Sequence, residues 1–375
     1  MTKEKAHLLI AIKPNDNEHW DFDDRLNEIL NLCRSASVEV VGITAQKQKS
    51  PQRTYLGSGK LSEAKNQIST DRSKIIIVDD AISPNQQRFL EDFFKIKVID
   101  RAALILDIFA ARARTREGRL QVGLAQAEYL LPRLAGQWSH LERLGGGVGT
   151  RGPGETQIET DRRLVRNRIR KIKKDLLKVK KSRNAQRSRR ISQAYNISLV
   201  GYTNAGKSTL FNQLSKKQVI SSSRLFSTLD TTTGQIYLGP NKSCTISDTV
   251  GFVNKLPTVL IDSFKATLEE LHDSDLLIHV IDASNPNYMK QVDVVDSLLE
   301  DLKLESKNIL YVLNKLDELS NSENKQVEES MEYLRKIDEQ MFIGVSALTG
   351  KNMENLFNLI QKHYNKRYNE TEVLI

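Results

Sequence analysis

The sequence contains little cysteine and no long apolar run. Only Cys33 and Cys244 occur in 375 residues, too few for a disulfide framework, and six histidines show no ligand spacing with them. No stretch approaches the roughly 18 apolar residues of a membrane span, and the N-terminal MTKEKAHLLIAIKPND reaches charged residues too early for a secretory signal. These absences exclude a disulfide-stapled secreted module and predict a cytoplasmic protein without a membrane span.

The length and composition are those of a globular protein with more than one core. At about 150 residues per domain, 375 residues allow two or three domains. Hydrophobic residues make up 39% and charged residues 27% of the chain, near the globular average. We expect a monomer built from several folded domains.

The net charge of +9 comes from one segment. Residues 161–190 contain 15 Lys and Arg but two Asp, a local charge of +13, so the other 345 residues carry −4. A solvated helix face normally mixes both signs. The surplus predicts contact with a polyanion, and nucleic acid is the polyanion we expect.

Two α/β regions flank a helical one. Apolar runs typical of strands occur at 7–12, 38–44, 74–80 and 96–100, and again at 197–202, 234–238, 244–250, 276–283, 308–314 and 341–347. Helical stretches separate most of them, and Ser83-Pro84 is a helix start signal. The pattern predicts a small parallel-sheet α/β domain over 1–105 and a doubly wound, mostly parallel six-stranded domain over 196–366, followed by a tail over 367–375.

The region between them, 106–190, has helical periodicity. Apolar residues are spaced 4-3-4-3 in two series: Leu120, Leu124, Ala127, Leu131 and Leu134, then Val165, Ile169, Ile172, Leu176 and Val179. The glycine-rich run LGGGVGTRGPGETQIETD (144–161) separates the two series. We predict a basic antiparallel helical hairpin with a mobile tip.

A phosphate-binding motif opens the last domain. The run from 201 to 208 fits G-x-x-x-x-G-K-[ST] between an expected strand and helix; it consists of Gly201, Tyr202, Thr203, Asn204, Ala205, Gly206, Lys207 and Ser208. Backbone N–H groups of such a loop surround phosphates, Lys207 reaches the β and γ oxygens, and Ser208 offers a hydroxyl to magnesium. The sequence therefore predicts a nucleoside triphosphate site that uses Mg²⁺.

Three further elements follow in order at expected strand ends. They are Asp248-Thr249-Val250-Gly251, then Asn314-Lys315-Leu316-Asp317, then Ser346-Ala347-Leu348. Asp248 is suited to hold magnesium through water, and the Gly251 N–H to contact the γ-phosphate. A carboxylate at Asp317 accepts hydrogen bonds from N1–H and the 2-amino group of guanine, which adenine cannot offer. The sequence therefore predicts GTP as the substrate.

A threonine-rich stretch, SSSRLFSTLDTTTG (221–234), stands where a switch loop is expected. One threonine there should complete the magnesium shell. We choose Thr228, and Thr231, Thr232 and Thr233 remain alternatives. A plain surface loop is the alternative for the whole stretch.

These elements together resemble the HflX family of translational GTPases. FSTLD (226–230), DTVGF (248–252) and above all LGGGVGTRGPGETQIETDRR (144–163) carry the resemblance, and YLGSGKLSEA (55–64) with VIDRAALILDIFAARARTREGRLQV (98–122) extend it over nearly the whole chain. The resemblance implies a cytoplasmic GTPase that binds the large ribosomal subunit and ribosomal RNA, associates with ribosomes and peripherally with membrane, and splits or rescues stalled ribosomes under stress.

The resemblance also implies roles for individual residues. Nucleotide contacts extend to Phe226, Ser227, Thr228, Leu229 and Asp230; magnesium binds Ser208 and Thr228; Lys207, Thr228 and Gly251 serve catalysis. Related GTPases with an asparagine at Asn204 bind potassium, so K⁺ is a further expected cofactor. Longer members carry an additional C-terminal domain, whereas here only a helix (352–366) and a short tail follow Ser346.

Catalysis is expected to depend on a partner. Many switch GTPases place a glutamine after the D-x-x-G glycine to orient the attacking water, but Phe252 stands at that position. We therefore predict a slow basal rate that ribosomes stimulate, and a tip (145–154) that enters a functional centre of the ribosome. The alternative for the tip is a simple flexible hinge.

Two alternative functions stay open. One is an RNA-binding guanine-nucleotide sensor that needs no catalysis, and the other is an RNA-stimulated ATPase, which conflicts with Asp317. Gly57-Ser58-Gly59-Lys60 resembles a second phosphate loop but lacks the full spacing and the hydroxyl, so we favour a turn before a helix. GTP turnover that rises with ribosomes would separate the alternatives.

Overall fold

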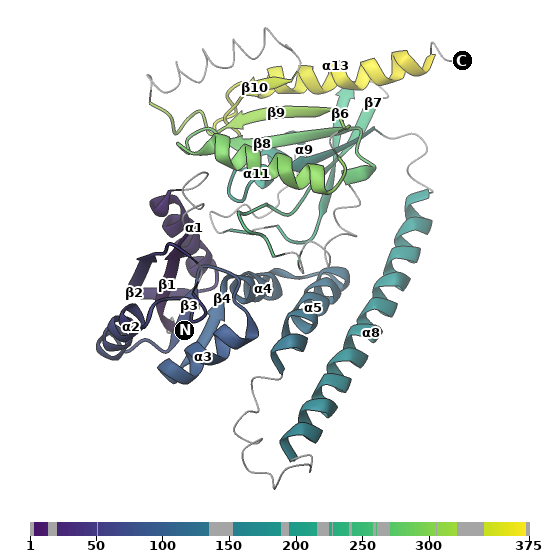
Figure 1. The fold of residues 1–375 in the computed structure, drawn as a ribbon. Helices are drawn as coiled ribbons and strands as arrows, with labels where there is room; N and C mark the ends of the chain where they lie inside the picture. Colours follow the sequence, from purple (N-terminus) through teal and green to yellow (C-terminus); the bar gives the residue numbers. More distant parts are fainter. Residues whose placement is uncertain are drawn as a thin grey trace. The chain divides into compact units, whose positions relative to one another are not determined.

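The computed structural model divides the chain into two compact units (Figure 1). The first contains Met1–Lys180 with Pro257–Ser263, and the second contains Lys181–Leu256 with Phe264–Ile375. The described residues are 4–13, 21–50, 52–134, 153–188, 195–215, 225–226, 228–239, 242–257, 260, 271–304, 306–320 and 341–372. The predicted tip lies almost wholly outside these residues, as does Ser227.

The first unit contains the expected small parallel sheet. Its strands follow the order β2-β1-β3-β4, and every neighbouring pair is parallel. They are β1 (Glu4–Ile12), β2 (Val38–Lys47), β3 (Ile75–Val78) and β4 (Lys97–Asp100). All four residues of β3 are buried, since helices cover both faces and a parallel strand then needs an unbroken apolar run.

Four helices accompany this sheet: α1 (Phe22–Ser35), α2 (Ser58–Asp71), α3 (Pro84–Phe94) and α4 (Arg101–Arg112). α2 and α3 share one core cluster with β1 and β3. The predicted start of α3 is confirmed, because Ser83 accepts from the Gln86 N–H in a capping box with Pro84 in the first turn. Gly57 precedes α2 as its N-cap, and Lys60 pairs on the surface with Glu63, as expected for a turn before a helix.

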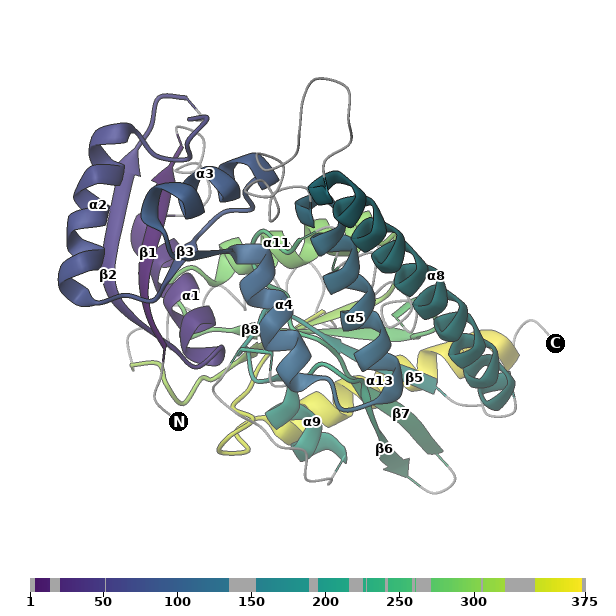
Figure 2. The same ribbon diagram turned by 90° about the horizontal axis from the view of Figure 1, so that it is seen from below.

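The helical hairpin consists of α5 (Arg116–Leu130), a short 3₁₀ turn η2 (Leu131–Arg133) and α8 (Pro153–Ser188). α5 and α8 lie side by side in Figures 1 and 2, with Gly123 facing Ile172 and Glu128 paired with Lys173 at 2.8 Å. Leu124, Ala127 and Ile172 are buried, which confirms the predicted apolar seam. The expected boundary at residue 105 falls inside the continuous helix α4.

The second unit contains the expected six-stranded sheet, in the order β10-β9-β8-β5-β7-β6. Of the five strand pairs that the described residues form in this sheet, only β6–β7 is antiparallel. The strands are β5 (Tyr195–Val200), β6 (Thr232–Gly239), β7 (Lys242–Asp248), β8 (Leu276–Asp282), β9 (Ile309–Asn314) and β10 (Phe342–Gly344). The chain leaves β5 to one side for β7 and returns on the other side for β8. Ligands bind at such a switch point, outside the carboxyl ends of the strands.

Helices cover both faces of the second sheet. α9 (Lys207–Ser215) and α13 (Met353–Glu372) belong to one core cluster, with Phe211 and Ile360 fully buried in it. α11 (Tyr288–Asp301) packs against β8 and places Val292 beside the opposite cluster. α13 extends beyond residue 366, where we expected it to end. No helix of the described residues is long and apolar enough to cross a membrane.

Candidate nucleotide-binding site

The phosphate loop connects β5 to α9 and requires its glycines. Gly201 has φ +146° and Gly206 has φ +94°, a region that side chains disfavour. A Cβ on Gly201 would collide with the carbonyl of Val280, and one on Gly206 with the amide of Asn314. The loop is therefore packed against two other strand ends, and the N-terminus of α9 follows it directly, where backbone N–H groups favour phosphate.

Lys207 is buried at the first residue of α9. Its ammonium donates to the carbonyls of Gly201 at 3.0 Å and Tyr202 at 2.8 Å. Burial lowers the pKa of Lys207 to about 8, and the nearby charge of Asp248 partly opposes this. A Cβ on Gly251 would lie 3.0 Å from the Lys207 Nζ, so the D-x-x-G glycine lies directly beside the lysine.

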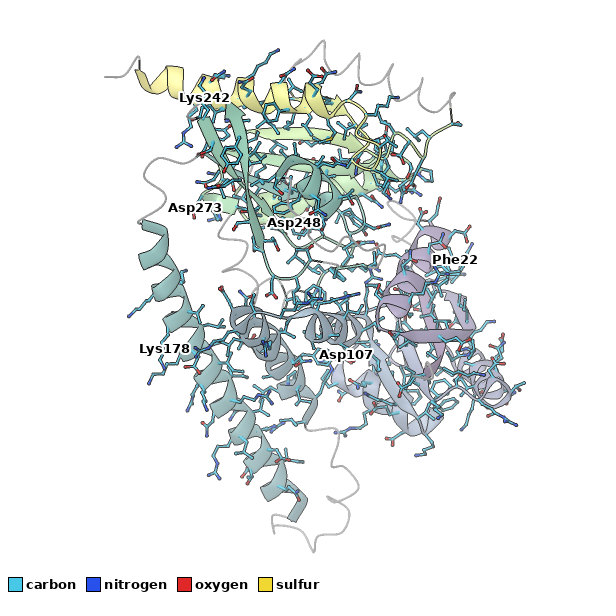
Figure 3. The ribbon with its side chains drawn as sticks, turned by 180° about the vertical axis from the view of Figure 1, so that it is seen from behind. Phe22, Asp107, Lys178, Lys242, Asp248 and Asp273 are labelled. Atoms are coloured by element: carbon cyan, nitrogen blue, oxygen red, sulfur yellow. The ribbon has the colours of Figure 1, made fainter. Side chains whose placement is uncertain are left out.

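Two hydroxyls and one carboxylate converge next to this lysine. Ser208 Oγ donates to Asp248 Oδ2 at 2.7 Å, Thr228 Oγ1 donates to the same oxygen at 2.8 Å, and the hydroxyls are 2.9 Å apart. All three residues are buried, and Asp248 stands at the end of β7 (Figure 3). Burial raises the pKa of Asp248, although both hydroxyl hydrogen bonds and Lys207 oppose it.

This donor set fits a magnesium ion. Hydroxyl and carboxylate oxygens are the hard ligands that Mg²⁺ prefers, and Asp248 Oδ1 is buried without a hydrogen-bond partner among the described residues. Ser208 and Thr228 would hold the ion, and Asp248 would hold its water. When bound, Mg²⁺ would supply positive charge that offsets the negative charge of the phosphates. Of the four threonines left open by the sequence, Thr228 reaches Ser208. The Thr231 hydroxyl is buried without a hydrogen-bond partner among the described residues, and Thr232 and Thr233 begin β6.

The other end of the site is built by β9 and the turn after β10. Asn314 donates to the Ala205 carbonyl at 2.9 Å and accepts from the Ala347 N–H at 2.9 Å, so it ties the phosphate loop to that turn. Asp317 is exposed, and the buried Ser346 hydroxyl donates to its Oδ1. The Asp317 carboxylate is thereby oriented for a base with two N–H donors.

Lys315 is held from the neighbouring strand end. It has φ +67°, and its ammonium donates to Asp282 Oδ2 at 2.6 Å. Asp282 in turn accepts from the hydroxyl of Ser284 at 2.6 Å. Sequence analysis did not single out Asp282, because its partner is 33 residues away along the chain.

One pocket of about 420 Å³ joins both ends, a size typical of ligand sites. Among the expected contacts it is lined by Thr203, Asn204, Gly206, Lys207, Ser208, Phe226, Thr228, Thr249, Gly251, Asn314, Lys315, Asp317, Ala347 and Leu348. The remaining expected residues in the described part of the chain do not line it: Gly201, Tyr202, Ala205, Leu229, Asp230, Asp248, Val250, Leu316 and Ser346. Thr209 and Glu318 also line it and were missed, although each directly follows a motif residue.

Comparisons with known proteins agree with this geometry. Residues 196–315 match the family model described as 50S ribosome-binding GTPase, 23–110 match GTP-binding GTPase N-terminal, and 112–190 match GTP-binding GTPase Middle Region. The GTPase HflX of Magnetococcus marinus is 42% identical over 376 residues, covering 99% of this chain and 85% of the relative. The chain belongs to the HflX GTPase family.

A second relative belongs to the same family, and one solved structure has the same fold. The GTPase HflX of Alkalihalophilus pseudofirmus is 46% identical over 318 residues, which cover 84% of this chain and 75% of the relative. The crystal structure of SsGBP with GDP shares the fold, with a TM-score of 0.54 at 24% identity, covering 96% of this chain and 98% of that one. As a member of the HflX family, the protein is a GTP hydrolase, and the family implies GTP as substrate with Mg²⁺.

Proposed function

We propose that this HflX-family GTPase binds the large ribosomal subunit and splits or rescues stalled ribosomes, with ribosome-stimulated hydrolysis. The match of 196–315 to a 50S ribosome-binding GTPase model supports the partner. The observation that carries the proposal furthest is the cationic face of α8. We further propose that the protein acts as a cytoplasmic monomer, which sedimentation velocity would test.

The exposed residues of α8 are predominantly basic. Ile172 is buried, whereas Leu164 and Leu177 are exposed between the basic residues, and Lys178 is labelled in Figure 3. The exposed basic residues of α8 include Arg163, Arg166, Arg168, Arg170, Lys171, Lys173, Lys174, Lys178 and Lys180, of which Lys173 pairs with Glu128 of α5. Such a helix fits the phosphate backbone of ribosomal RNA, because each neutralised phosphate releases counterions.

Charge reversal tests this face. We expect the triple variant Arg166→Glu, Arg170→Glu and Lys174→Glu to lose affinity for large subunits. The slope of log affinity against log salt should fall by about one unit per lost phosphate contact. The matched control reverses the half-buried Lys60 and the exposed Lys65, both on α2, and the exposed Lys95 just after α3. Unchanged affinity and slope in the first triple would refute the proposal.

Partner-dependent hydrolysis is the second part of the proposal. Phe252, at the usual glutamine position, is 2% exposed and has no hydrogen-bonding side chain. Another group must therefore orient the attacking water, and we propose that the ribosome supplies or orders it. Basal GTP turnover should be slow and rise with large subunits, and sucrose gradients should show splitting of intact ribosomes. A fast basal rate that ribosomes leave unchanged would contradict this mechanism.

Two finer proposals concern potassium and the tip. Asn204, exposed in the pocket, is proposed to bind K⁺ near the phosphates, so hydrolysis should be faster in potassium than in sodium. Equal rates in both salts, together with an unchanged rate in Asn204→Ala, would refute the potassium site and leave the rest of the proposal intact.

Shortening the tip (145–154) should spare GTP binding and weaken ribosome splitting. Full splitting activity in the shortened variant would contradict the proposal that the tip enters a functional centre of the ribosome.

A further inference from the structure

The segment after the D-x-x-G aspartate is hydrogen-bonded to the phosphate loop itself. The Thr203 N–H donates to the Phe252 carbonyl at 2.8 Å, and the Phe252 N–H donates to the Gly201 carbonyl at 3.1 Å. The two segments thus form an isolated parallel bridge between Tyr202 and Phe252. The buried Phe252 is therefore an anchor of this segment.

A side chain of the phosphate loop extends this contact. The Tyr202 hydroxyl accepts from the Asn254 N–H at 2.8 Å, and the residue is 5% exposed. The Tyr202 carbonyl at the same time accepts from Lys207. One residue therefore touches both the phosphate-binding lysine and the backbone two residues beyond Phe252.

The position of Gly251 depends on these contacts. A Cβ there would lie 2.8 Å from Thr203 Cγ2 and 3.0 Å from Lys207 Nζ, so the glycine is wedged against the loop. Its N–H is the group expected to contact the γ-phosphate, and hydrogen-bond strength falls steeply with misalignment. A shift of the 252–254 backbone would therefore weaken a contact to GTP that GDP does not make.

We propose that Tyr202 is a positioning residue for GTP hydrolysis, whose hydroxyl holds the 251–254 segment against the phosphate loop and so sets Gly251 for the γ-phosphate. The proposal rests on the GTPase activity of the family and not on ribosome binding. It separates two properties: affinity for GDP, which the loop and the guanine end supply, and the preference for GTP, which Tyr202 supports.

The variant Tyr202→Phe removes the hydroxyl and keeps the ring. We expect GDP affinity to stay within about twofold, while affinity for a non-hydrolysable GTP analogue and basal kcat each fall about five- to tenfold, the effect of losing one buried hydrogen bond. The matched control is Tyr237→Phe, because Tyr237 is 72% exposed on β6 and its hydroxyl donates to Gln235 of the same strand, away from the phosphate loop.

The experiment is done without ribosomes, so a failure of ribosome binding cannot affect it. Amide exchange of the 252–256 peptide supplies an independent readout and should be faster in Tyr202→Phe with GDP bound. Equal losses for GDP and the GTP analogue would overturn the proposal, since Tyr202 would then shape the loop as a whole. Unchanged hydrolysis and GTP preference would overturn it too.

Discussion

The carboxyl edges of the two parallel sheets carry similar polar residues but use them differently. In the second unit, Lys207 and Asp317 line one pocket, and Asp248 lies behind its lining, hydrogen-bonded to Ser208. In the first unit, Asp79, Asp80 and Asp100 follow β3 or end β4 and are nearly completely buried. The same architecture thus supports a ligand site in one unit and a closed cluster of charges in the other.

Arginines neutralise the cluster in the first unit. Asp79 accepts from Arg25 at 3.0 Å and from Arg101 at 2.8 Å, and Arg101 also pairs with Glu28. Asp100 accepts from Arg133 at 3.1 Å and from the Tyr129 hydroxyl at 2.8 Å. Charges buried in this way offset their desolvation with one another, and removal of one member leaves the rest uncompensated.

At the phosphate end of the nucleotide pocket, the described residues form no such ion pair. Lys207 donates to carbonyls and Asp248 Oδ1 has no partner in the described part of the chain. The depressed pKa of Lys207 and the raised pKa of Asp248 both reflect burial that a phosphate and a cation would compensate. The comparison teaches that the supply of counter-charges by the chain, rather than the fold, separates a structural cluster from a binding site.

The largest expected effect concerns the closed cluster. Asp79→Ala should lower the free energy of unfolding by about 3–5 kcal/mol, because two buried guanidinium groups lose a partner. GDP affinity of the remaining folded protein should not change. Urea denaturation measures the loss, with Lys60→Ala, which removes an exposed ion pair, as a control expected within about 1 kcal/mol of the parent. A loss of stability as small as that of the control would show that the buried arginines of the first unit do not depend on Asp79 for neutralisation.

For Lys207→Ala we expect a large loss of activity and a small loss of stability, the reverse of Asp79→Ala. Lys207→Ala should lower kcat/KM for GTP by roughly 100- to 1000-fold, as loss of a preorganised donor at a charged transition state does. The unfolding free energy should fall by no more than about 1 kcal/mol, since a buried ammonium with a depressed pKa opposes folding at neutral pH. Steady-state kinetics and urea denaturation measure the two effects. A large loss of stability would place Lys207 with the structural charges.

Asp282 resembles the acidic residues of the first unit because it pairs with a cation of the protein, Lys315, but this ion pair lies beside the nucleotide pocket. We therefore expect Asp282→Asn to affect nucleotide binding. Loss of this charged hydrogen bond should weaken GDP and GTP binding by the same factor, about tenfold. Fluorescence titration with both nucleotides measures the factor. Asp275→Asn, before β8 at the opposite edge of the sheet, is the control and should leave both affinities intact. A selective effect on GTP would contradict a role at the guanine end.

The smallest effect is a pH dependence of GDP binding. Protonated Lys207 attracts phosphate, so binding raises its pKa above the free value of about 8. GDP affinity should therefore be highest well below pH 8 and decline as pH rises through 8, by about threefold between pH 7.5 and 8.5. Lys207→Arg keeps its charge and should flatten the difference, whereas titration of the nucleotide itself affects both proteins. If GDP affinity depends on pH in the same way in the parent and in Lys207→Arg, Lys207 is fully protonated over this pH range.

Local patterns in the sequence were sufficient for much of the fold and for the order of the motifs. Continuous apolar runs such as Ile75–Val78 predicted buried parallel strands, and Ser83-Pro84 predicted a helix start, because both depend on neighbours along the chain. The two glycines of the phosphate loop were recognisable for the same reason. Their spacing encodes a backbone shape that only glycine adopts.

Tertiary structure decided which distant groups meet. Thr228, chosen from the sequence among four threonines, meets Ser208 and Asp248 only in the fold, and the roles proposed for Asp282 and Tyr202 depend on partners 33 and 52 residues away. The sequence by itself predicted most strands and helices, the phosphate loop and GTP as the substrate, since each is written in adjacent residues. Counter-charges and hydrogen-bond partners are supplied by other strands, so only the folded chain determines whether a buried carboxylate is neutralised or left for a ligand.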